Sequence, residues 1–237
     1  MKGKRDLEQV IRVKYNKKGP IKYISHLNLA QVFTRALRRA NIPVVISSGF
    51  NPRFRISFGP PLALGISGES EFFDIRLKKI MKIEALIKKM NQALPLGIEI
   101  ISAQIISPST DSLVKSIDKA TYLIDFELNS TAKNLESEIE NNIEHFLGLK
   151  EIWIEKMGKM GSKKINIRPT IASLKILDLD MFNGKLKLKL ELKISNNGNL
   201  NPNYVIRAWL LKYHYGFDLT SVSRTSLSIA DKEVMKS

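Results

Sequence analysis

The sequence predicts an α+β protein built from two similar units in tandem. Three observations lead to this prediction: runs whose apolar residues alternate as in strands, runs whose apolar residues recur every three or four positions as in helices, and one element order met twice. That order, strand–helix–strands–helix–strand, is typical of a ferredoxin-like sandwich, an antiparallel sheet with helices on one face. We therefore expect a basic ferredoxin-like domain at 1–107, a linker at 108–118 and a second ferredoxin-like domain at 119–237.

The first half supplies all the elements of one unit. An alternating strand comes first and is followed by a helix that Ser25 can cap. A Gly-Pro-Pro sequence then ends a later alternating run at Phe58. The predicted strands are 10–15, 44–47, 53–58, 71–77 and 98–106, and the predicted helices are 25–40 and 83–94.

The second half repeats the pattern after a Ser-, Thr- and Pro-containing stretch at 107–112, which is typical of a linker. Pro202 stands near the first turn of the last predicted helix, where its missing N–H does no harm. The predicted strands are 122–128, 151–156, 164–174, 185–194 and 221–229, and the predicted helices are 132–147 and 202–213.

The composition excludes several classes of site. The chain has no cysteine, so it has no disulfide, no thiolate zinc site and no cysteine-ligated iron–sulfur cluster, and we expect no cofactor in this chain. The first residues are charged rather than apolar, and no apolar run approaches the roughly eighteen residues of a membrane span. These features predict a cytoplasmic protein that does not contact a membrane.

The charge is unevenly distributed. Residues 1–108 carry 19 Lys+Arg and 7 Asp+Glu, a net charge of +12, whereas residues 109–237 carry 19 and 16, a net charge of +3. The stretch 9–68 has ten basic residues and no acidic one. Because like charges repel on a surface, such a stretch indicates a polyanionic partner, and the absence of an amphipathic membrane helix favours nucleic acid.

Three surfaces of the first half are candidates for contact with RNA. The polar side of the predicted sheet presents cations, including Arg76, that can grip phosphates or stack on bases. A second group lies on the outer side of the first helix, and a third lies around the start of that helix and the turn near Asn51. The candidate RNA-binding residues are Arg12, Lys14, Lys22, His26, Arg35, Arg38, Arg39, Asn51, Arg53 and Arg55. The alternative is that these are ordinary solvated surface residues.

Two basic stretches of the second half are weaker candidates. The loop 156–164 contains four lysines and two glycines and has the composition of a backbone clamp or of a plain surface loop. Lys185, Lys187, Lys189 and Lys193 alternate along one strand, whose predicted neighbour offers Asp125 and Glu127. Cross-strand pairing explains these four lysines without a ligand.

The sequence contains no catalytic constellation that we recognise. It has no Walker loop, no Gly-x-Gly-x-x-Gly motif after a strand and no nucleophile elbow. His26, the one histidine of the basic segment, is either a general base for RNA cleavage or a hydrogen-bonding residue that contacts phosphate. We expect His145 and His214 to be structural.

Several motifs resemble those of a known family. They are Lys22-Tyr23-Ile24-Ser25-His26-Leu27-Asn28, the arginine-rich helix from Arg35 to Ala40, Ser48-Gly49-Phe50-Asn51-Pro52-Arg53, Arg55-Ile56-Ser57-Phe58 and Pro61-Leu62-Ala63-Leu64-Gly65. Together they resemble the bacterial radical-SAM-associated family catalogued as DUF2344, most densely over residues 10–105. Asn166-Ile167-Arg168-Pro169 and Ser223-Arg224-Thr225 continue the likeness, whereas Asn28 stands where the family usually has Asp. The resemblance implies a partner, a radical SAM protein with a cobalamin-type domain.

The sequence therefore favours a non-catalytic accessory protein that presents structured RNA, ribosomal or transfer RNA, to that partner enzyme. One alternative is a metal-independent endoribonuclease, because tandem ferredoxin-like domains also occur in CRISPR repeat-processing nucleases. The glycine-free stretch 221–237 counts against it, since those nucleases grip RNA with a glycine-rich loop near this end. A third possibility is an adaptor that binds the radical SAM enzyme without RNA.

Overall fold

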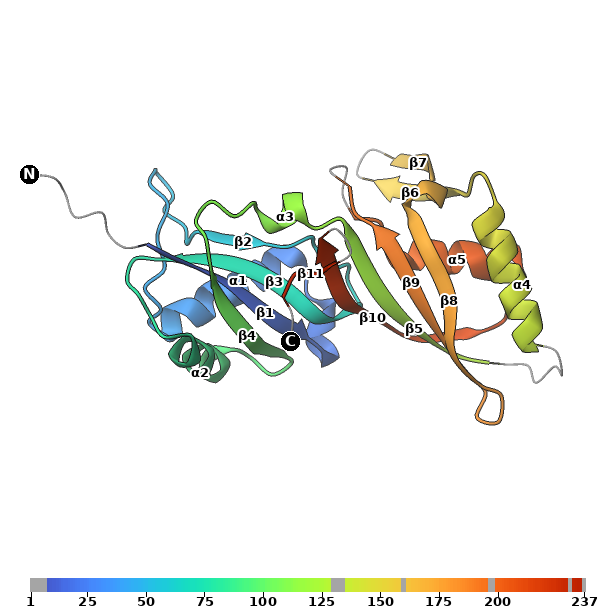
Figure 1. Ribbon diagram of the computed structural model, residues 1–237, viewed down its shortest axis with the longest axis horizontal. Helices are drawn as coiled ribbons and strands as arrows, with labels where there is room; N and C mark the ends of the chain where they lie inside the picture. Colours follow the sequence, from blue (N-terminus) through green and yellow to red (C-terminus); the bar gives the residue numbers. More distant parts are fainter. Residues whose placement is uncertain (1–7, 129–134, 159–160, 196–198, 230–231, 236–237) are drawn as a thin grey trace, which may run out of the picture. The chain divides into compact units, whose positions relative to one another are not determined.

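The computed structural model describes residues 8–128, 135–158, 161–195, 199–229 and 232–235 (Figure 1). The chain divides into two compact units, Met1–Ile117 with Lys232–Ser237, and Asp118–Asp231. Each unit combines antiparallel strands with helices, so the predicted α+β class is confirmed.

The first unit is built on the strand order β4-β1-β3, with β2 beside β3, and all of its pairs are antiparallel. Its strands are β1 (Gln9–Lys17), β2 (Ile56–Phe58), β3 (Ser67–Leu77) and β4 (Ile98–Ile106). Its helices are the 3-10 helix η1 (Gly19–Tyr23), α1 (His26–Arg39), α2 (Ile83–Ala93) and α3 (Leu113–Ser116). The two-residue strand β11 (Lys232–Glu233) belongs to the same unit.

Helix α1 forms where the sequence predicts it. The Ser25 side chain accepts a hydrogen bond from the Asn28 backbone N–H (3.1 Å), which satisfies one of the free donors at the start of the helix. The buried side of α1 packs against the sheet, and the rings of Phe33 and Phe73 lie 4.7 Å apart. Helix α2 contributes Leu86 and Met90 to the same core, so α1 and α2 cover one face of the sheet (Figure 1).

The chain between α1 and β2 differs from the prediction. The predicted strand 53–58 is reduced to β2, and the residues before it pair with 44–47 instead of continuing the sheet. Isolated bridges join Val44 to Leu77 and Ile46 to Phe54. The segment 44–56 is therefore a hairpin that projects from the first unit, seen as the light-blue loop in Figure 1.

The predicted linker 108–118 contains helix α3. Leu113, its first residue, is fully buried, and α3 packs beside β2 and β3. This short helix could not be predicted from the sequence, because four residues are too few to show a helical period and the residues before it are typical of a linker.

The second unit has the strand order β10-β5-β9-β8, again with antiparallel pairs throughout. Its sheet strands are β5 (Lys119–Glu127), β8 (Ile171–Asp180), β9 (Lys185–Lys193) and β10 (Asp218–Ile229), and its helices are α4 (Leu135–Gly148), η2 (Arg168–Thr170) and α5 (Pro202–Lys212). If the four sheet strands are numbered in chain order, β5 is the first and β10 the fourth, and the spatial order across the sheet is fourth, first, third, second. The first unit has the same arrangement.

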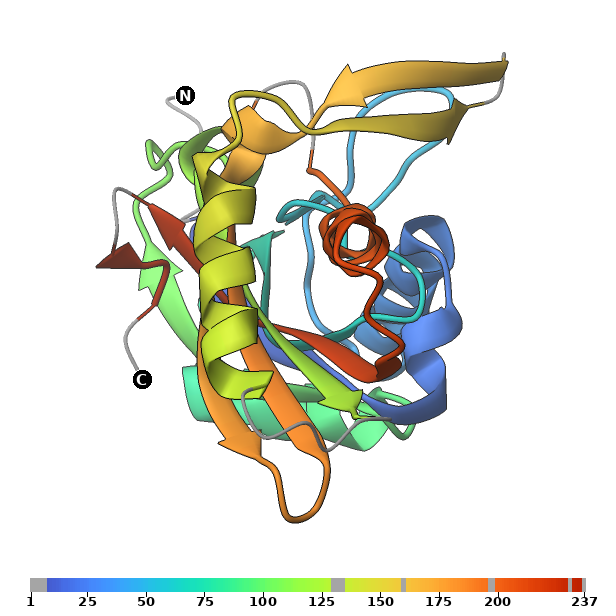
Figure 2. The same ribbon diagram turned by 90° about the vertical axis from the view of Figure 1, so that its right-hand side faces the viewer.

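A separate hairpin is inserted between α4 and β8 of the second unit. Its strands, β6 (Trp153–Gly158) and β7 (Gly161–Asn166), pair with each other and stand apart from the four sheet strands of this unit (Figure 2). The single strand predicted at 164–174 is thus two strands, β7 and β8, separated by η2. Pro169 fits η2 because it lacks a backbone N–H and has a fixed φ angle.

Two residues fix the chain at this corner. The Asn166 side chain accepts hydrogen bonds from the backbone N–H groups of Ile152 and Arg168, both at 3.0 Å. Arg168 donates from Nε to the Leu147 carbonyl at 2.8 Å, which satisfies an acceptor near the end of α4. The Asn-Ile-Arg-Pro motif is therefore structural in this unit.

Candidate nucleic-acid interface

Arg12 lies on the sheet face opposite the helices, as predicted, but it is not free to meet a ligand. Its Nε and Nη2 donate to the two carboxylate oxygens of Asp74 at 2.9 and 3.0 Å. The two side chains are only 5% and 12% exposed. Because Asp74 and the neighbouring strand enclose the guanidinium, Arg12 is a structural residue in this conformation.

The rest of this sheet face is only partly open. Arg76 forms an ion pair with Glu8 (2.7 Å), whereas Lys14 is half-buried and has no acidic partner among the described residues. The segment before α3 lies over the face and leaves a hollow of about 250 Å³, lined by Arg55, Arg76 and Asp74 with the residues that follow β4. The predicted open, basic sheet surface is therefore smaller than the sequence suggested.

The arginines of the projecting hairpin remain accessible. Arg53 and Arg55 are both exposed and lie on the side of the hairpin opposite Phe54, whose ring packs toward the core. The backbone places them firmly: the Ser47 N–H donates to the Arg53 carbonyl (2.8 Å), and the Arg55 N–H donates to the Val45 carbonyl (2.9 Å). Asn51 lies exposed at the hairpin tip.

The arginines of α1 separate into two groups. Arg38 lies over the ring of Phe54, with its guanidinium carbon 5.4 Å from the ring centroid, and the exposed Arg35 lies one turn before it. Arg39 points elsewhere and donates to the Ala93 carbonyl at the end of α2. Arg35 and Arg38 therefore face the hairpin, whereas Arg39 ties α1 to α2.

Lys22 and His26 lie at the start of α1. The ammonium group of Lys22 is 5.2 Å from the centroid of the Tyr23 ring, and the half-buried His26 ring meets the ring of Phe58 edge-on at 5.3 Å. The backbone N–H of Gly65 donates to the Lys22 carbonyl (3.1 Å), so the Pro-Leu-Ala-Leu-Gly motif packs on this segment. His26 has the surroundings of a packed residue.

Five predicted residues lie on the hairpin and on the part of α1 that contacts it where Arg38 lies over Phe54. They are Arg35, Arg38, Asn51, Arg53 and Arg55, and we call them the hairpin surface. Arg38 lies on one side of the hairpin stem, and Arg53 and Arg55 lie on the other. A polyanion would therefore have to extend across the hairpin tip to contact all three. Arg12 and Arg39 are engaged within the protein, and Lys14, Lys22 and His26 lie outside this surface.

One lysine of β9, Lys187, pairs across the strands with a predicted partner, and Lys189 pairs with a residue of its own strand. Lys187 pairs with Asp125 across the strands (3.5 Å), and Lys189 and Lys119 both approach Glu191, at 3.1 and 3.9 Å. Burial by itself would raise the pKa of Glu191, but hydrogen bonds from Lys189 and Ser173 and the positive charge of Lys119 lower it overall. Lys187 and Lys189 are therefore paired within the protein itself.

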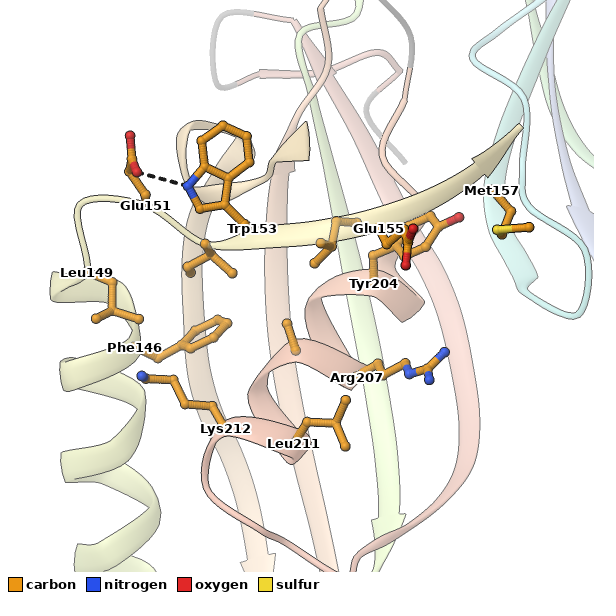
Figure 3. A pocket seen from close by; sticks show the side chains of 13 residues that line it. Phe146, Leu149, Glu151, Trp153, Glu155, Met157, Tyr204, Arg207, Leu211 and Lys212 are labelled. Atoms are coloured by element: carbon orange, nitrogen blue, oxygen red, sulfur yellow. Dashed lines mark hydrogen bonds between the residues drawn. The ribbon is translucent and has the colours of Figure 1, made fainter. Parts of the chain in front are cut away.

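The predicted basic loop 156–164 forms parts of both strands of the β6–β7 hairpin, and residues 159–160 lie outside the described residues. Beneath this hairpin, α4 and α5 form a groove of about 660 Å³ (Figure 3). Phe146, Ile154 and Leu211 supply apolar lining, while Arg207 and Lys212 project from α5. This groove has no signal in the sequence, because its residues come from three separate segments.

The groove carries charges of both signs. On β6 and just before it, Glu151 accepts a hydrogen bond from the Trp153 indole N–H (2.9 Å), and Glu155 accepts one from the Ser162 hydroxyl. Arg207 has no carboxylate partner within the described ranges. The groove therefore combines an apolar lining with two carboxylates on its β6 side and the cations Arg207 and Lys212 on its α5 side.

The described residues contain no cluster of three or more His, Asp and Glu side chains that could hold a metal ion. His145 Nδ1 and the Tyr213 hydroxyl share a hydrogen bond (2.8 Å), and burial raises the pKa of Tyr213. Helices long and apolar enough to cross a membrane are absent from the same part of the chain.

Comparison with known sequences identifies one family. The family model described as "Uncharacterized protein conserved in bacteria (DUF2344)" matches residues 10–202, which include most of both units. No curated protein sequence matches the chain.

Comparison with solved structures finds a similar fold in a Cbf5–Nop10–Gar1 complex. The matched chain is 10% identical and gives a TM-score of 0.50, over 92% of this chain and 48% of its own length. A chain of an H/ACA RNP bound to a substrate RNA containing 2'-deoxyuridine gives 0.45 at 11% identity, covering 96% of this chain and 49% of its own. The present chain thus spans about half the length of each of these two chains.

Proposed function

Since the chain belongs to the bacterial DUF2344 family, whose biochemical role its description leaves open, we propose that it binds RNA through the hairpin surface and presents it to a partner enzyme. The observation that carries the proposal is the hairpin surface itself. Its four arginines lie in a stretch of sixty residues that contains no acidic residue. Exposed arginines that form no ion pair with any described residue suit the phosphates of a polyanion.

The strand order leads to a separate proposal about the fold. The strand order shared by both units, with the fourth strand beside the first and then the third and second, is the order of the split βαβ arrangement. We therefore propose that both units are ferredoxin-like, with the β6–β7 hairpin as an insertion in the second. Because a fold does not fix a function, RNA binding rests on the arginines and not on this assignment.

The proposed partner is a radical SAM protein, as the family resemblance implies, and the proposed RNA is structured ribosomal or transfer RNA. The groove of the second unit supports a protein contact that is separate from the RNA contact. Its exposed Trp153 and Leu211, together with Arg207, have the character of a protein interface, where aromatic residues and arginine are enriched.

The test of RNA binding uses the full chain with Arg53→Glu and Arg55→Glu together. Binding to transfer RNA and to ribosomal RNA fragments is measured across a range of salt concentrations. For the wild type, log affinity should fall by roughly 0.7 to 0.9 per phosphate contact for each tenfold rise in salt. The variant should bind weakly and with a shallower slope.

The matched control is Lys88→Glu with Lys89→Glu, which makes the same change in charge at exposed positions of α2 in the same unit. Equal loss of affinity in both variants would show that only net charge matters and would refute the hairpin surface. Absence of RNA binding by the wild type would leave the adaptor alternative. RNA cleavage that His26→Ala abolishes would instead support the endoribonuclease.

The partner contact is tested by purification from cells and mass spectrometry of the proteins that accompany the chain. Arg207→Glu with Leu211→Glu should release the radical SAM protein while RNA binding persists. The control, Lys175→Glu with Leu177→Glu, makes the same charge change at two exposed positions on β8. Retention of the partner by the groove variant would refute this docking site.

A further inference from the structure

Phe50 stands at the tip of the hairpin with its side chain fully exposed, at 106% of the reference area. Its neighbours Gly49, Asn51, Pro52 and Arg53 are exposed as well, so the ring packs against none of the described residues. Burying a phenylalanine side chain stabilises a protein, and this position forgoes that stabilisation. The ring is therefore available to a ligand.

The stem of the hairpin holds this ring in a defined place. The Arg53 N–H donates to the Ser47 hydroxyl at 3.0 Å, in addition to the backbone bond between the same two residues. Gly49 has a φ of +131°, a conformation open mainly to glycine, which lets the chain reverse at the tip. At the base, Phe54 packs into the core beneath Arg38.

The surroundings of the ring identify the kind of ligand. Arg53 follows it in sequence, and the nearest acidic residues in the chain lie outside 9–68. A membrane surface needs several bulky apolar groups side by side, and here the residues next to Phe50 are glycine, asparagine and proline. A single exposed aromatic ring among arginines matches the way proteins hold single-stranded nucleic acid, with a base stacked on the ring and phosphates on the cations.

We propose that Phe50 stacks on an unpaired base, so that the chain selects RNA with exposed nucleotides, such as loops, bulges and single strands, over continuous duplex. This inference rests on the proposed RNA binding and specifies the substrate class of the same site. Bases inside a duplex are already stacked on each other and offer no free face to a side chain. The arginines of the hairpin surface supply affinity for either form, and the ring supplies the preference.

The test compares one RNA hairpin with an unpaired loop, a single strand and a blunt duplex of similar length, at one fixed salt concentration. Phe50→Ala should weaken binding to the loop and the single strand by about 5- to 150-fold, the equivalent of one base stack, and leave duplex affinity unchanged. Phe50→Tyr should retain the wild-type preference, and Phe50→Leu should lose most of it. Because the position is exposed and unpacked, these variants should fold normally.

A spectroscopic measurement checks the contact directly. Phe50→Trp places an indole at the hairpin tip, and Trp153→Phe removes the other exposed tryptophan. The remaining tryptophan, Trp209, is buried, so a change in fluorescence on binding reports on the tip. The single strand should quench its fluorescence, and the duplex should not. If Phe50→Ala lowers affinity equally for all three RNAs, or for none, while Arg53→Glu with Arg55→Glu still abolishes binding, stacking is refuted and RNA binding stands. If the wild type binds none of these RNAs, the proposed function itself fails.

Discussion

The two units of this chain arrange their strands in the same order but use their cations differently. In the second unit, two lysines of β9 form ion pairs, Lys187 with Asp125 on the neighbouring strand and Lys189 with Glu191 on its own strand. In the first unit, Arg53 and Arg55 lie on a hairpin and form no ion pair with any described residue. Both patterns look basic in the sequence.

The comparison teaches that strand register decides what a run of cations does. A lysine opposite an acidic residue on the neighbouring strand is neutralised locally, whatever the composition of its own strand. Arg12 makes the same point in the first unit, because it lies opposite Asp74 and forms a buried pair. Only the arginines that leave the sheet remain available for a ligand.

The largest effect is expected for Arg12→Ala. Removing the guanidinium leaves the Asp74 carboxylate nearly buried without its partner, which should lower the free energy of unfolding by about 3–5 kcal/mol. Denaturant unfolding measures this change, and Lys14→Ala, two residues away and unpaired, should cost less than about 1 kcal/mol. If the Arg12→Ala variant has normal stability but fails to bind RNA, Arg12 is a ligand contact and not a structural residue.

The next largest effect concerns the stretch 108–118. Leu113→Ala removes a fully buried side chain and should cost about 3 kcal/mol of unfolding free energy, whereas the exposed neighbour Val114→Ala should be nearly neutral. Thermal or urea unfolding distinguishes the two variants. Equal, small effects would mean that this stretch behaves as a linker, as the sequence suggested.

A third experiment removes the difference between the units. Asp125→Asn with Glu191→Gln frees the β9 lysines without changing side-chain size. We expect roughly a threefold gain in RNA affinity and a salt slope steeper by about 1, as one new phosphate contact would give. Glu136→Gln with Glu138→Gln on α4 adds the same charge away from those lysines. An equal gain in both variants would assign the effect to net charge.

The smallest effect is a pH dependence at Glu191. Its lowered pKa means that the charged form favours the folded state, so its stabilising contribution is present above the ordinary value of 4.5 and is lost as pH falls through the lowered pKa. Glu191→Gln should therefore reduce stability by less than about 1 kcal/mol at pH 7 and by nothing at pH 3. Urea unfolding at both pH values checks this; a difference that persists at pH 3 would point to lost packing instead.

Several elements were predictable because their signals are local. Ser25 caps α1 as expected, and the strand predicted at 98–106 has the bounds of β4. A cap and an alternating pattern can each be recognised from residues close in sequence.

The missed features depend on residues far apart in the chain. Asp74 lies 62 positions after Arg12, so their pairing follows from the register of β1 and β3 and not from either strand alone. The exposure of Phe50 depends on where the segment 44–56 reverses direction. The reversal places Phe50 at the exposed tip and Phe54 against the core. The groove beneath β6 joins three segments and has no signature in any one of them.

The projecting hairpin also makes the chain convenient for chemical labelling. Because the sequence has no cysteine, a single Asn51→Cys substitution would place the sole thiol of the protein at an exposed position beside Phe50. A photoreactive cross-linker or a spin label attached there would report which nucleotides come within its reach, with no background from other thiols. The same absence that rules out metal thiolates and disulfides thus allows the contacts of one loop to be mapped nucleotide by nucleotide.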